Sequence, residues 1–285
     1  SITHYLYGGD WENRLKQEML LGIGGIRALR ALNKEAQVYH CNEGHAAFIG
    51  LERLREYVVQ DNLTFGEALE VVRSSSLFTT HTPVPAGHDS FGEDLLRGYM
   101  SHYPSRLKIS WEMMMSLGKL NPNNPDEKFS MSNLACNLSQ EINGVSWLHG
   151  KVSREILSPL WPGYLPEELH VGYVTNGVHY PTWTAAEWKD VHADAFGDDF
   201  ATHNYDKSCF EGIYNIEESR IWSVRNKLRT RMIKTIKNSL SNTSETTHYT
   251  PQQVVAIKEA LRDDILTIGF ARRFATYKRA HLLFK

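Results

Sequence analysis

The clearest sign of the fold is the stretch ILTIGFARRFATYKRAHLLFK, residues 265–285. Its first six residues, Ile265 to Phe270, form a short apolar run of β-prone side chains, which predicts a buried parallel strand. A helical pattern begins at Ala280. A buried strand followed by a helix is the building unit of a parallel α/β sheet, so this class of fold is expected for the whole chain.

Four cations lie between this expected strand and the helix: Arg272, Arg273, Lys278 and Arg279. Cations near a helix N-terminus oppose the helix dipole unless an anion lies among them. Ligands of open α/β sheets bind beyond the carboxyl ends of the strands, and phosphate groups suit helix N-termini. The stretch therefore predicts a phosphate site, with a solvent-exposed basic face as the alternative.

The expected strand also needs partners. A parallel strand requires neighbours in its sheet and a completed crossover, yet the sequence stops within the first turns of the next helix. We therefore interpret the sequence as an internal fragment of a longer protein.

Composition sets limits on the class of protein. Of the 285 residues, 41% are hydrophobic and 22% charged, which is typical of a globular protein with a sizeable core. A net charge of −2 argues against nucleic acid or an anionic membrane as the main partner. No apolar run approaches the roughly twenty residues of a membrane span. The three cysteines are widely spaced and fit a reducing compartment, so we expect the cytoplasm. They are Cys41, Cys136 and Cys209.

Strand and helix patterns alternate along the rest of the chain, which predicts a parallel sheet. Strands are expected at 37–41, 77–80 and 171–174, and helices at 11–32, 46–59, 64–74, 131–141, 145–157 and 216–240. Gly22, Gly24 and Gly25 interrupt the first helix, which indicates either a close approach of another backbone or a break. Asn143–Gly144 is expected as a hinge between two helices.

Four helix starts are expected from residues that can form capping boxes. These pairs are Thr64 with Glu67, Ser90 with Glu93, Thr184 with Glu187, and Thr250 with Gln253.

Three expected strand ends are followed by turns rich in polar groups. These turns are Asn42–His45, Thr80–Thr82 with His88–Asp89, and Thr175–Gly177. In an α/β sheet such turns share the ligand-binding edge, and a sugar needs several donors and acceptors there to replace its water. Each turn alone has another explanation: His81 as a structural histidine, and Asn176–Gly177 as a turn with positive φ. The spacing of His40, Glu43 and His45 matches no familiar metal site.

Six stretches, in order along nearly the whole chain, resemble the α-glucan phosphorylases (glycogen, starch and maltodextrin), particularly the shorter bacterial branch. They are LYGGDWENRLKQEMLLGIGGIRAL, HCNEGHAAF, FTTHTPVPAGHD, LSQEINGVSWLHGKVSREI, VTNGVHYPTW and GFARRFATYKRAHLLF. The resemblance implies a GT-B architecture of two Rossmann-like domains with the active site in the cleft between them. Residues 1–178 would form the latter part of the N-terminal domain, and 179–285 the start of the C-terminal domain, which binds cofactor and phosphate.

The resemblance also implies roles for individual residues. His81 matches the histidine that lies against the glucosyl unit at the cleaved bond, and Asn176 the asparagine that binds a sugar hydroxyl. Arg273 matches the arginine that holds the substrate phosphate, and Tyr277 the tyrosine beside the sugar 2-hydroxyl. Lys278 matches the lysine near both the substrate phosphate and the cofactor phosphate.

Two positions depart from the common family pattern. Arg272 stands where mammalian-type members have lysine, which keeps the charge but not the geometry of a contact with cofactor phosphate. Glu43 stands where aspartate is common, and with His45 it is expected to line the mouth of the sugar pocket.

The implied reaction is phosphorolysis with retention: orthophosphate attacks the terminal α-1,4-linked glucose of a glucan and releases glucose 1-phosphate. The implied cofactor is pyridoxal phosphate, which relays a proton through its phosphate while its aldehyde is bound to a lysine expected beyond Lys285. The 285-residue chain alone is therefore expected to be inactive and to carry no covalent cofactor. The full-length protein is expected to be a homodimer.

Two other functions stay open on the sequence alone. A glycogen or starch synthase shares the architecture but uses a nucleotide-sugar donor, and no base-and-ribose pocket is evident. A glucan-binding module without catalysis is compatible with the aromatic content. A Rossmann oxidoreductase is not, because no Gly-x-Gly-x-x-Gly turn follows a strand, and Ser139 lacks the Gly-x-Ser-x-Gly context of a hydrolase nucleophile.

Overall fold

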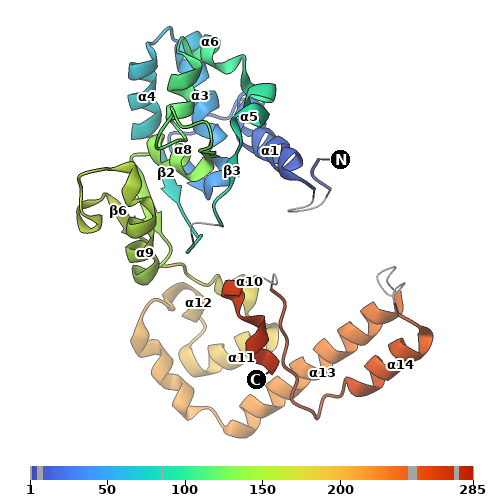
Figure 1. Ribbon diagram of the computed structural model, residues 1–285. Helices are drawn as coiled ribbons and strands as arrows, with labels where there is room; N and C mark the ends of the chain where they lie inside the picture. Colours follow the sequence, from blue (N-terminus) through green and yellow to red (C-terminus); the bar gives the residue numbers. More distant parts are fainter. Residues whose placement is uncertain (1, 5–8, 85–86, 243–248, 273–275, 285) are drawn as a thin grey trace. The chain divides into compact units, whose positions relative to one another are not determined.

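The computed structural model describes residues 2–4, 9–84, 87–242, 249–272 and 276–284 (Figure 1). The chain divides into two compact units, Ser1–Gly177 and Val178–Lys285. The assignment of 1–178 and 179–285 to two GT-B domains stays a prediction.

The first unit is built on a sheet of four parallel strands in the order β1-β2-β5-β6. The strands are β1 (Tyr39–Asn42), β2 (Ser76–Thr79), β5 (Glu141–Gly144) and β6 (Val171–Tyr173). All three neighbouring pairs are parallel, with Phe78 of β2 opposite Cys41 on one side and Ile142 on the other. The carboxyl ends of all four strands therefore lie at one edge of the sheet. This confirms the α/β class and the parallel sheet.

Strand β5 was not expected. The two expected helices form over Met131–Asn137 and Trp147–Leu157. The hinge predicted at Asn143–Gly144 was wrong, because these residues end a strand that is hydrogen-bonded between β2 and β6. Its four residues include only one large apolar side chain, Ile142. A hydrophobic pattern cannot identify so short a strand, and its pairing with both neighbours decides its structure.

Helices cover this sheet (Figure 1). They are α1 (Trp11–Met19), α2 (Gly25–Ala31), α3 (Phe48–Val59), α4 (Phe65–Ser74), α5 (Glu93–Met100), α6 (Tyr103–Leu107), α7 (Trp111–Ser116), α8 (Met131–Asn137) and α9 (Trp147–Leu157). Short 3-10 turns are η2 (Gly44–Ala46), η4 (Ser158–Leu160) and η5 (Pro166–Glu168). The capping box of Thr64 and Glu67 is confirmed at the start of α4.

A second expected capping box is absent. Ser90 pairs with Ser130 in a short antiparallel ladder of β3 (Ser90–Phe91) and β4 (Phe129–Ser130), and Gly92 precedes α5 instead. The prediction of a helix start at Ser90 was therefore wrong. Buried Phe91 and Phe129 face each other in this ladder, and their burial favours a strand over a helix cap here.

The glycines of the first helix mark a change of helix type. The π-helical segment η1 (Leu20–Gly24) joins α1 to α2 without a gap. A Cβ atom on Gly22 would lie 2.7 Å from Cβ of Phe48 and 2.9 Å from the backbone nitrogen of Ile49, so α3 packs directly against this backbone. The expected close approach of another backbone is confirmed, and the helical run continues through it.

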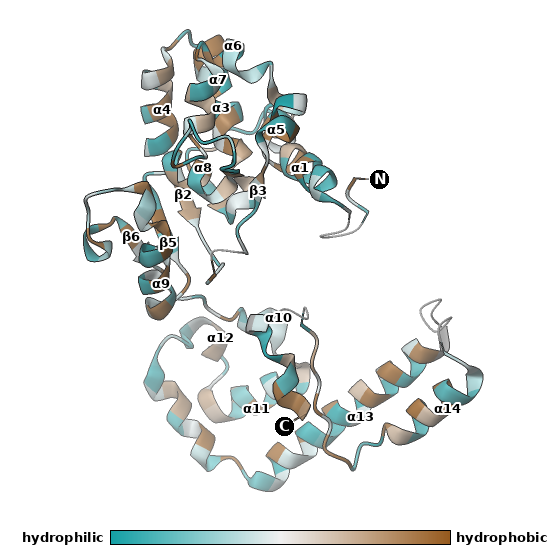
Figure 2. Ribbon diagram, viewed as in Figure 1, coloured by the Kyte–Doolittle hydropathy of each residue, from teal (hydrophilic) through white to brown (hydrophobic). Residues whose placement is uncertain are grey.

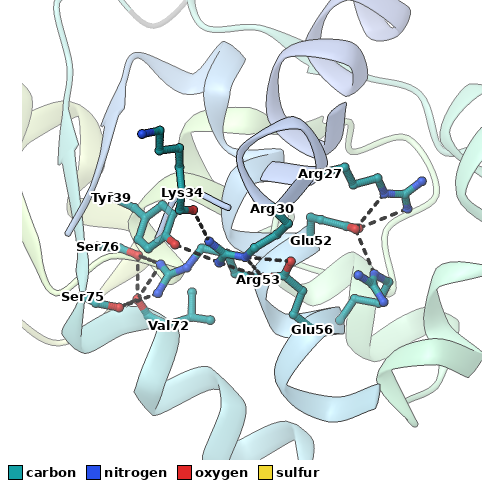
Figure 3. Close-up of polar contacts among 11 residues, drawn as sticks. Arg27, Arg30, Lys34, Tyr39, Glu52, Arg53, Glu56, Val72, Ser75 and Ser76 are labelled. Carbon is teal, nitrogen blue, oxygen red and sulfur yellow. Dashed lines mark hydrogen bonds and ion pairs between the residues drawn. The ribbon is translucent and has the colours of Figure 1, made fainter. Parts of the chain in front are cut away.

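Helix α3 is held by buried charges as well as by the apolar core (Figure 3). The fully buried carboxylate of Glu52 accepts hydrogen bonds from Arg27 Nε at 2.8 Å and from Tyr103 Oη at 2.6 Å. Burial would raise the pKa of Glu52, but these hydrogen bonds and the charge of Arg55 lower it below its usual value. A buried charge satisfied in this way fixes α3 against α2 and α6.

Arg53 ties the same helix to the sheet (Figure 3). It is 1% exposed, its guanidinium lies 3.7 Å from the ring centroid of Tyr39, and it donates to the hydroxyls of Ser75 and Ser76 at 2.5 and 2.9 Å. These contacts join α3 to the start of β1 and β2.

Among the described residues of the second unit, helices are the only regular secondary structure. Its elements are α10 (Tyr180–Trp183), α11 (Ala186–Phe196), α12 (Phe200–His203), η6 (Lys207–Asn215), α13 (Glu218–Asn242), α14 (Pro251–Ala260), η8 (Thr276–Lys278) and η9 (Ala280–Phe284). The capping box of Thr250 and Gln253 is confirmed, whereas Ala185 rather than Thr184 precedes α11. No helix in the described part of the chain has both the length and the apolar character needed to cross a membrane.

The expected strand at 265–270 does not form. Its residues are not part of any strand, and Leu266 is 80% and Ile268 71% exposed. The prediction of a buried strand was therefore wrong for this chain. No described residue of the second unit forms a strand that could pair with this segment, and hydrophobic residues also recur along the exposed faces of α13 and α14 (Figure 2).

Candidate functional site

The polar turns of the first unit lie together at the carboxyl edge of the sheet. Glu43 follows β1, Thr80 and His81 follow β2, Val145 follows β5, and Asn176 lies shortly after β6. Parallel pairing brings these turns to one edge. The edge is the candidate functional site, and it contains all four predicted site residues of the first unit.

The turns after β1 and β2 are joined by the Glu43 carboxylate. Its Oε1 accepts the backbone N–H of His81, and it also accepts the Thr82 hydroxyl at 3.0 Å. The His81 ring is exposed, and its Nε2 lies 2.6 Å from Oδ1 of Asn42. Glu43 therefore holds the backbone of His81, while the contact with Asn42 favours one rotamer of the His81 side chain.

Glu43 itself has an unfavourable backbone conformation. Its φ is 70° and its ψ 164°, a region that is populated almost only by glycine. Such a conformation costs about 1–3 kcal/mol in a residue with a Cβ atom. Backbone strain of this kind is concentrated at functional sites, where the side chain has to be held in one position.

A row of polar groups lies beneath these turns, and its Thr79, Thr80 and Asn143 members are buried. Thr79 Oγ1 donates to Oδ1 of Asn143 at 2.9 Å and lies 2.7 Å from Nε2 of His40. The backbone N–H of Thr80 donates to the carbonyl of Asn143 at 3.0 Å. These bonds cross β1, β2 and β5, so the ends of the three strands are fixed relative to one another.

The turn after β6 is fixed to the turn after β5. The N–H of Val174 donates to the carbonyl of Gly144 at 2.9 Å, and the N–H of Asn176 donates to the carbonyl of Val145 at 3.2 Å. Asn176 is exposed and has a side-chain amide that can both donate and accept. Its backbone is thus held while its side chain faces solvent.

A cluster of charges borders the site. Arg14 lies between two carboxylates, with Nη2 2.7 Å from Asp89 and Nε 2.9 Å from buried Glu18. The ion pair with Arg14 favours the charged form of Glu18, but burial, followed by the negative charge of Asp89, outweighs it. Together they raise the pKa of Glu18 to about 9. We therefore assign Glu18 as protonated at neutral pH.

Two histidines in this region are kept neutral. Burial lowers the pKa of His45, and the positive charge of Arg14 lowers it further. Burial also lowers the pKa of His88, against the opposing effect of Glu43 and Asp89. Neutral imidazoles can donate and accept hydrogen bonds at once, which suits recognition of sugar hydroxyls. Among the described residues, no group of three or more histidine, cysteine, aspartate or glutamate side chains is arranged to hold a metal ion.

The remaining predicted residues belong to the second unit. Arg272 is exposed, and Lys278 is half-buried at the end of η8. Arg273 lies outside the described residues, as does the side chain of Tyr277, so their predicted roles stay untested.

Several residues of the edge were missed from the sequence alone. Arg14 and Glu18 lie on α1, far along the chain from the turns that they border, and nothing in a helical pattern points to them. The sequence pattern predicts a hinge at Asn143 and an ordinary helix around His149. No signal in the sequence marks Asn143 as buried, because its burial follows from the pairing of β5 with β2 and β6.

The sequence matches the carbohydrate phosphorylase family over residues 24–282. It is 39% identical to a glycogen phosphorylase of Mycobacterium tuberculosis, an alignment that covers all of this chain and 34% of the relative. It is 37% identical to a maltodextrin phosphorylase of Thermococcus litoralis and 31% identical to a glycogen phosphorylase of Aquifex aeolicus, each over 99% of this chain.

The chain spans about a third of the length of these relatives, from 32% to 40%. The match nevertheless extends over both units and includes the strand-end turns of the first and the cationic segment of the second. The chain therefore belongs to the carbohydrate phosphorylase family.

Proposed function

We propose that the protein to which this chain belongs catalyses phosphorolysis of the terminal α-1,4-linked glucose of a glucan, with retention, to give glucose 1-phosphate. The observation that carries the proposal is the cross-linked edge of the parallel sheet, where Glu43, held in a strained conformation, ties the His81 backbone in place. The names of the relatives, glycogen phosphorylase and maltodextrin phosphorylase, support the choice of substrate.

The first unit supplies the sugar-binding side chains in this proposal. We assign His81 and Asn176 to hydroxyls of the terminal glucosyl unit, and Glu43 with His45 to the mouth of the pocket. The support is physical: exposed, prepositioned polar groups at one edge can replace the hydration of a sugar without having to be ordered first. The protonation assigned to Glu18 keeps the net negative charge beside the site low.

The second unit supplies the phosphate-binding side chains. We assign Arg273 and Lys278 to orthophosphate and Tyr277 to the sugar 2-hydroxyl. Phosphorolysis requires cations that stabilise the attacking phosphate and the charge that develops during transfer. The segment from Arg272 to Arg279 carries four cations within eight residues, which fits that requirement.

We also propose pyridoxal phosphate as the cofactor. The described cations fit its phosphate group by charge: Arg272 is exposed and Lys278 half-buried, and an arginine or lysine suits a phosphate dianion. When bound, the cofactor supplies a phosphate that can exchange a proton with the substrate phosphate. The part of this chain is to hold two phosphates close together, which Lys278 and its neighbouring arginines do by offsetting the repulsion between them.

The partners follow from the reaction: an α-1,4-glucan, orthophosphate and glucose 1-phosphate. We propose a homodimer for the full-length protein, without a nucleic acid or membrane partner. We further propose a cytoplasmic location, which is supported by three cysteines that form no disulfide.

The experiment uses the full-length protein with Arg273→Ala and a matched control, Arg262→Ala. Arg262 belongs to the same unit but is exposed and paired with Asp264. We expect the Arg273 variant to lose phosphate-dependent release of glucose 1-phosphate by about 10²-fold or more, because a transition-state charge loses its partner. The control should keep its rate.

Two other results would identify a different function. Glucan extension from a nucleotide sugar would identify a synthase. Glucan binding that does not depend on phosphate, with no turnover in the wild type, would identify a binding module.

A further inference from the structure

His149 lies in the first turn of α9, directly after the strand β5. Ser146 caps this helix by accepting the backbone N–H of His149 at 3.2 Å. The imidazole does not contribute to that cap. Its Nδ1 instead accepts the backbone N–H of Val145, at 3.1 Å, which lies outside the helix.

This contact determines the tautomer of the imidazole ring. Because Nδ1 accepts an N–H, it carries no proton, so the neutral ring carries its proton on Nε2. The Nε2 atom is buried and has no hydrogen-bond partner among the described residues. Of the hydrogen bonds described for this ring, the bond to Val145 is thus the one that orients it.

Val145 connects the His149 ring to the predicted sugar site by hydrogen bonds. Its N–H is held by His149, and its carbonyl accepts the N–H of Asn176 at 3.2 Å. Asn176 is the residue assigned above to a sugar hydroxyl. A hydrogen-bonded path of two contacts therefore joins the imidazole to the backbone of Asn176.

The ring has little room to move. A Cβ atom on Gly144 would lie 2.9 Å from Nδ1 of His149 and 2.9 Å from the backbone nitrogen of Gly150. The glycine thus allows α9 to lie directly against the end of β5. Close packing of this kind transmits a shift of the ring to the turn.

We propose that His149 is a positioning residue for glucan binding, which acts by holding the Val145 backbone and through it Asn176. The proposal rests on the proposed function, since it places the terminal sugar at this edge. His149 acts in this role through Nδ1 as a hydrogen-bond acceptor. The positioning of Asn176 does not depend on a charge or a proton transfer of the ring.

The test compares three substitutions in the full-length protein. In His149→Asn, the side-chain oxygen stands near the position of Nδ1, so the acceptor is kept. In His149→Gln, a polar amide stands near Nε2 instead, and His149→Leu has no acceptor. The dissociation constant for maltopentaose is measured by calorimetry, and KM and kcat for phosphorolysis are measured in parallel.

We expect His149→Leu and His149→Gln to raise the dissociation constant about tenfold, because the part-buried N–H of Val145 loses its acceptor and the turn shifts. His149→Asn should stay within about threefold of the wild type. KM should follow the dissociation constant, and kcat should change less.

Two controls separate positioning from stability. Ser146→Ala removes the cap of α9 but leaves the bond from Val145 to Nδ1, so it should lower the melting temperature without changing the dissociation constant. His170→Asn makes the same chemical change at an exposed histidine that pairs with Glu141 at the opposite edge of the sheet, and it should change neither quantity.

The outcomes distinguish this proposal from the proposed reaction. Equal affinity in all variants, or equal loss in His149→Asn and His149→Leu, overturns the positioning role even when phosphorolysis is present. The expected affinity pattern without any glucose 1-phosphate overturns the reaction and keeps the positioning role. A wild type that binds no maltopentaose overturns both.

Discussion

The carboxylate of Glu43 accepts the backbone N–H of His81, so the turn after β1 holds the turn after β2. The same oxygen accepts the hydroxyl of Thr82 at 3.0 Å. One acidic side chain thus fixes two consecutive residues of the neighbouring turn. Its own backbone is strained, with φ at 70°, which indicates that the surrounding structure holds it in place.

The first prediction separates the strain of Glu43 from its side chain. Glu43→Gly and Glu43→Ala both remove the carboxylate and should both lower glucan affinity by at least about tenfold, because the His81 turn loses its acceptor. Glycine accepts the backbone conformation and alanine does not. We therefore expect the glycine variant to be more stable than the alanine variant by about 1 kcal/mol. Chemical unfolding of the two full-length variants checks the order, and a more stable alanine variant would contradict it.

The second prediction concerns two glycines of one helical run. Gly22→Ala places a Cβ atom 2.7 Å from Phe48 and 2.9 Å from the backbone of Ile49, so it should destabilise the protein by about 1–3 kcal/mol. Gly25→Ala meets nothing within 4 Å and should stabilise the helix by up to about 1 kcal/mol. Melting temperatures of the pair should therefore move in opposite directions. A shift of the same sign in both would contradict the close approach of α3.

The third prediction is a pH dependence that arises from Glu18. Its folded-state pKa, about 9, lies above the usual 4.5, so the unfolded chain releases this proton at a lower pH than the folded one. The associated stability is fully present below about pH 4.5 and is lost as the pH rises toward 9.

Glu18→Gln keeps the shape of the protonated carboxyl and removes the loss of folding stability that occurs as the pH rises. The variant should match the wild type near pH 5 and exceed it at neutral pH, by on the order of 3 kcal/mol. Thermal unfolding at pH 5, 7 and 8.5 measures the difference. An advantage that is the same at all three pH values would show that Glu18 is ionised throughout.

Local signals in the sequence predicted local structure only in part. The capping boxes at Thr64 and Thr250 formed, whereas those expected at Ser90 and Thr184 did not. The strand expected at 265–270 did not form either. Its apolar composition is typical of a buried strand, but a strand requires partners, and its residues stay exposed here.

In the candidate site, too, the local turns were predictable from the sequence and the long-range contacts were not. The turns that contain Glu43, His81 and Asn176 were predictable, because parallel strands bring their carboxyl ends to one edge. The contact of Arg14 with Asp89 joins residues 75 positions apart, and the bond from Val145 to His149 depends on a strand that the hydrophobic pattern did not reveal. Such contacts follow from packing and cannot be found in a local pattern.

The measurement that matters most is the dependence of glucose 1-phosphate release on orthophosphate and on pyridoxal phosphate. The full-length protein is incubated with a maltodextrin, with and without orthophosphate, before and after the cofactor is stripped. We predict product that requires orthophosphate, disappears on stripping and returns when the cofactor is added back. Glucan extension from a nucleotide sugar, or glucan binding without product, would contradict the assignment to phosphorolysis.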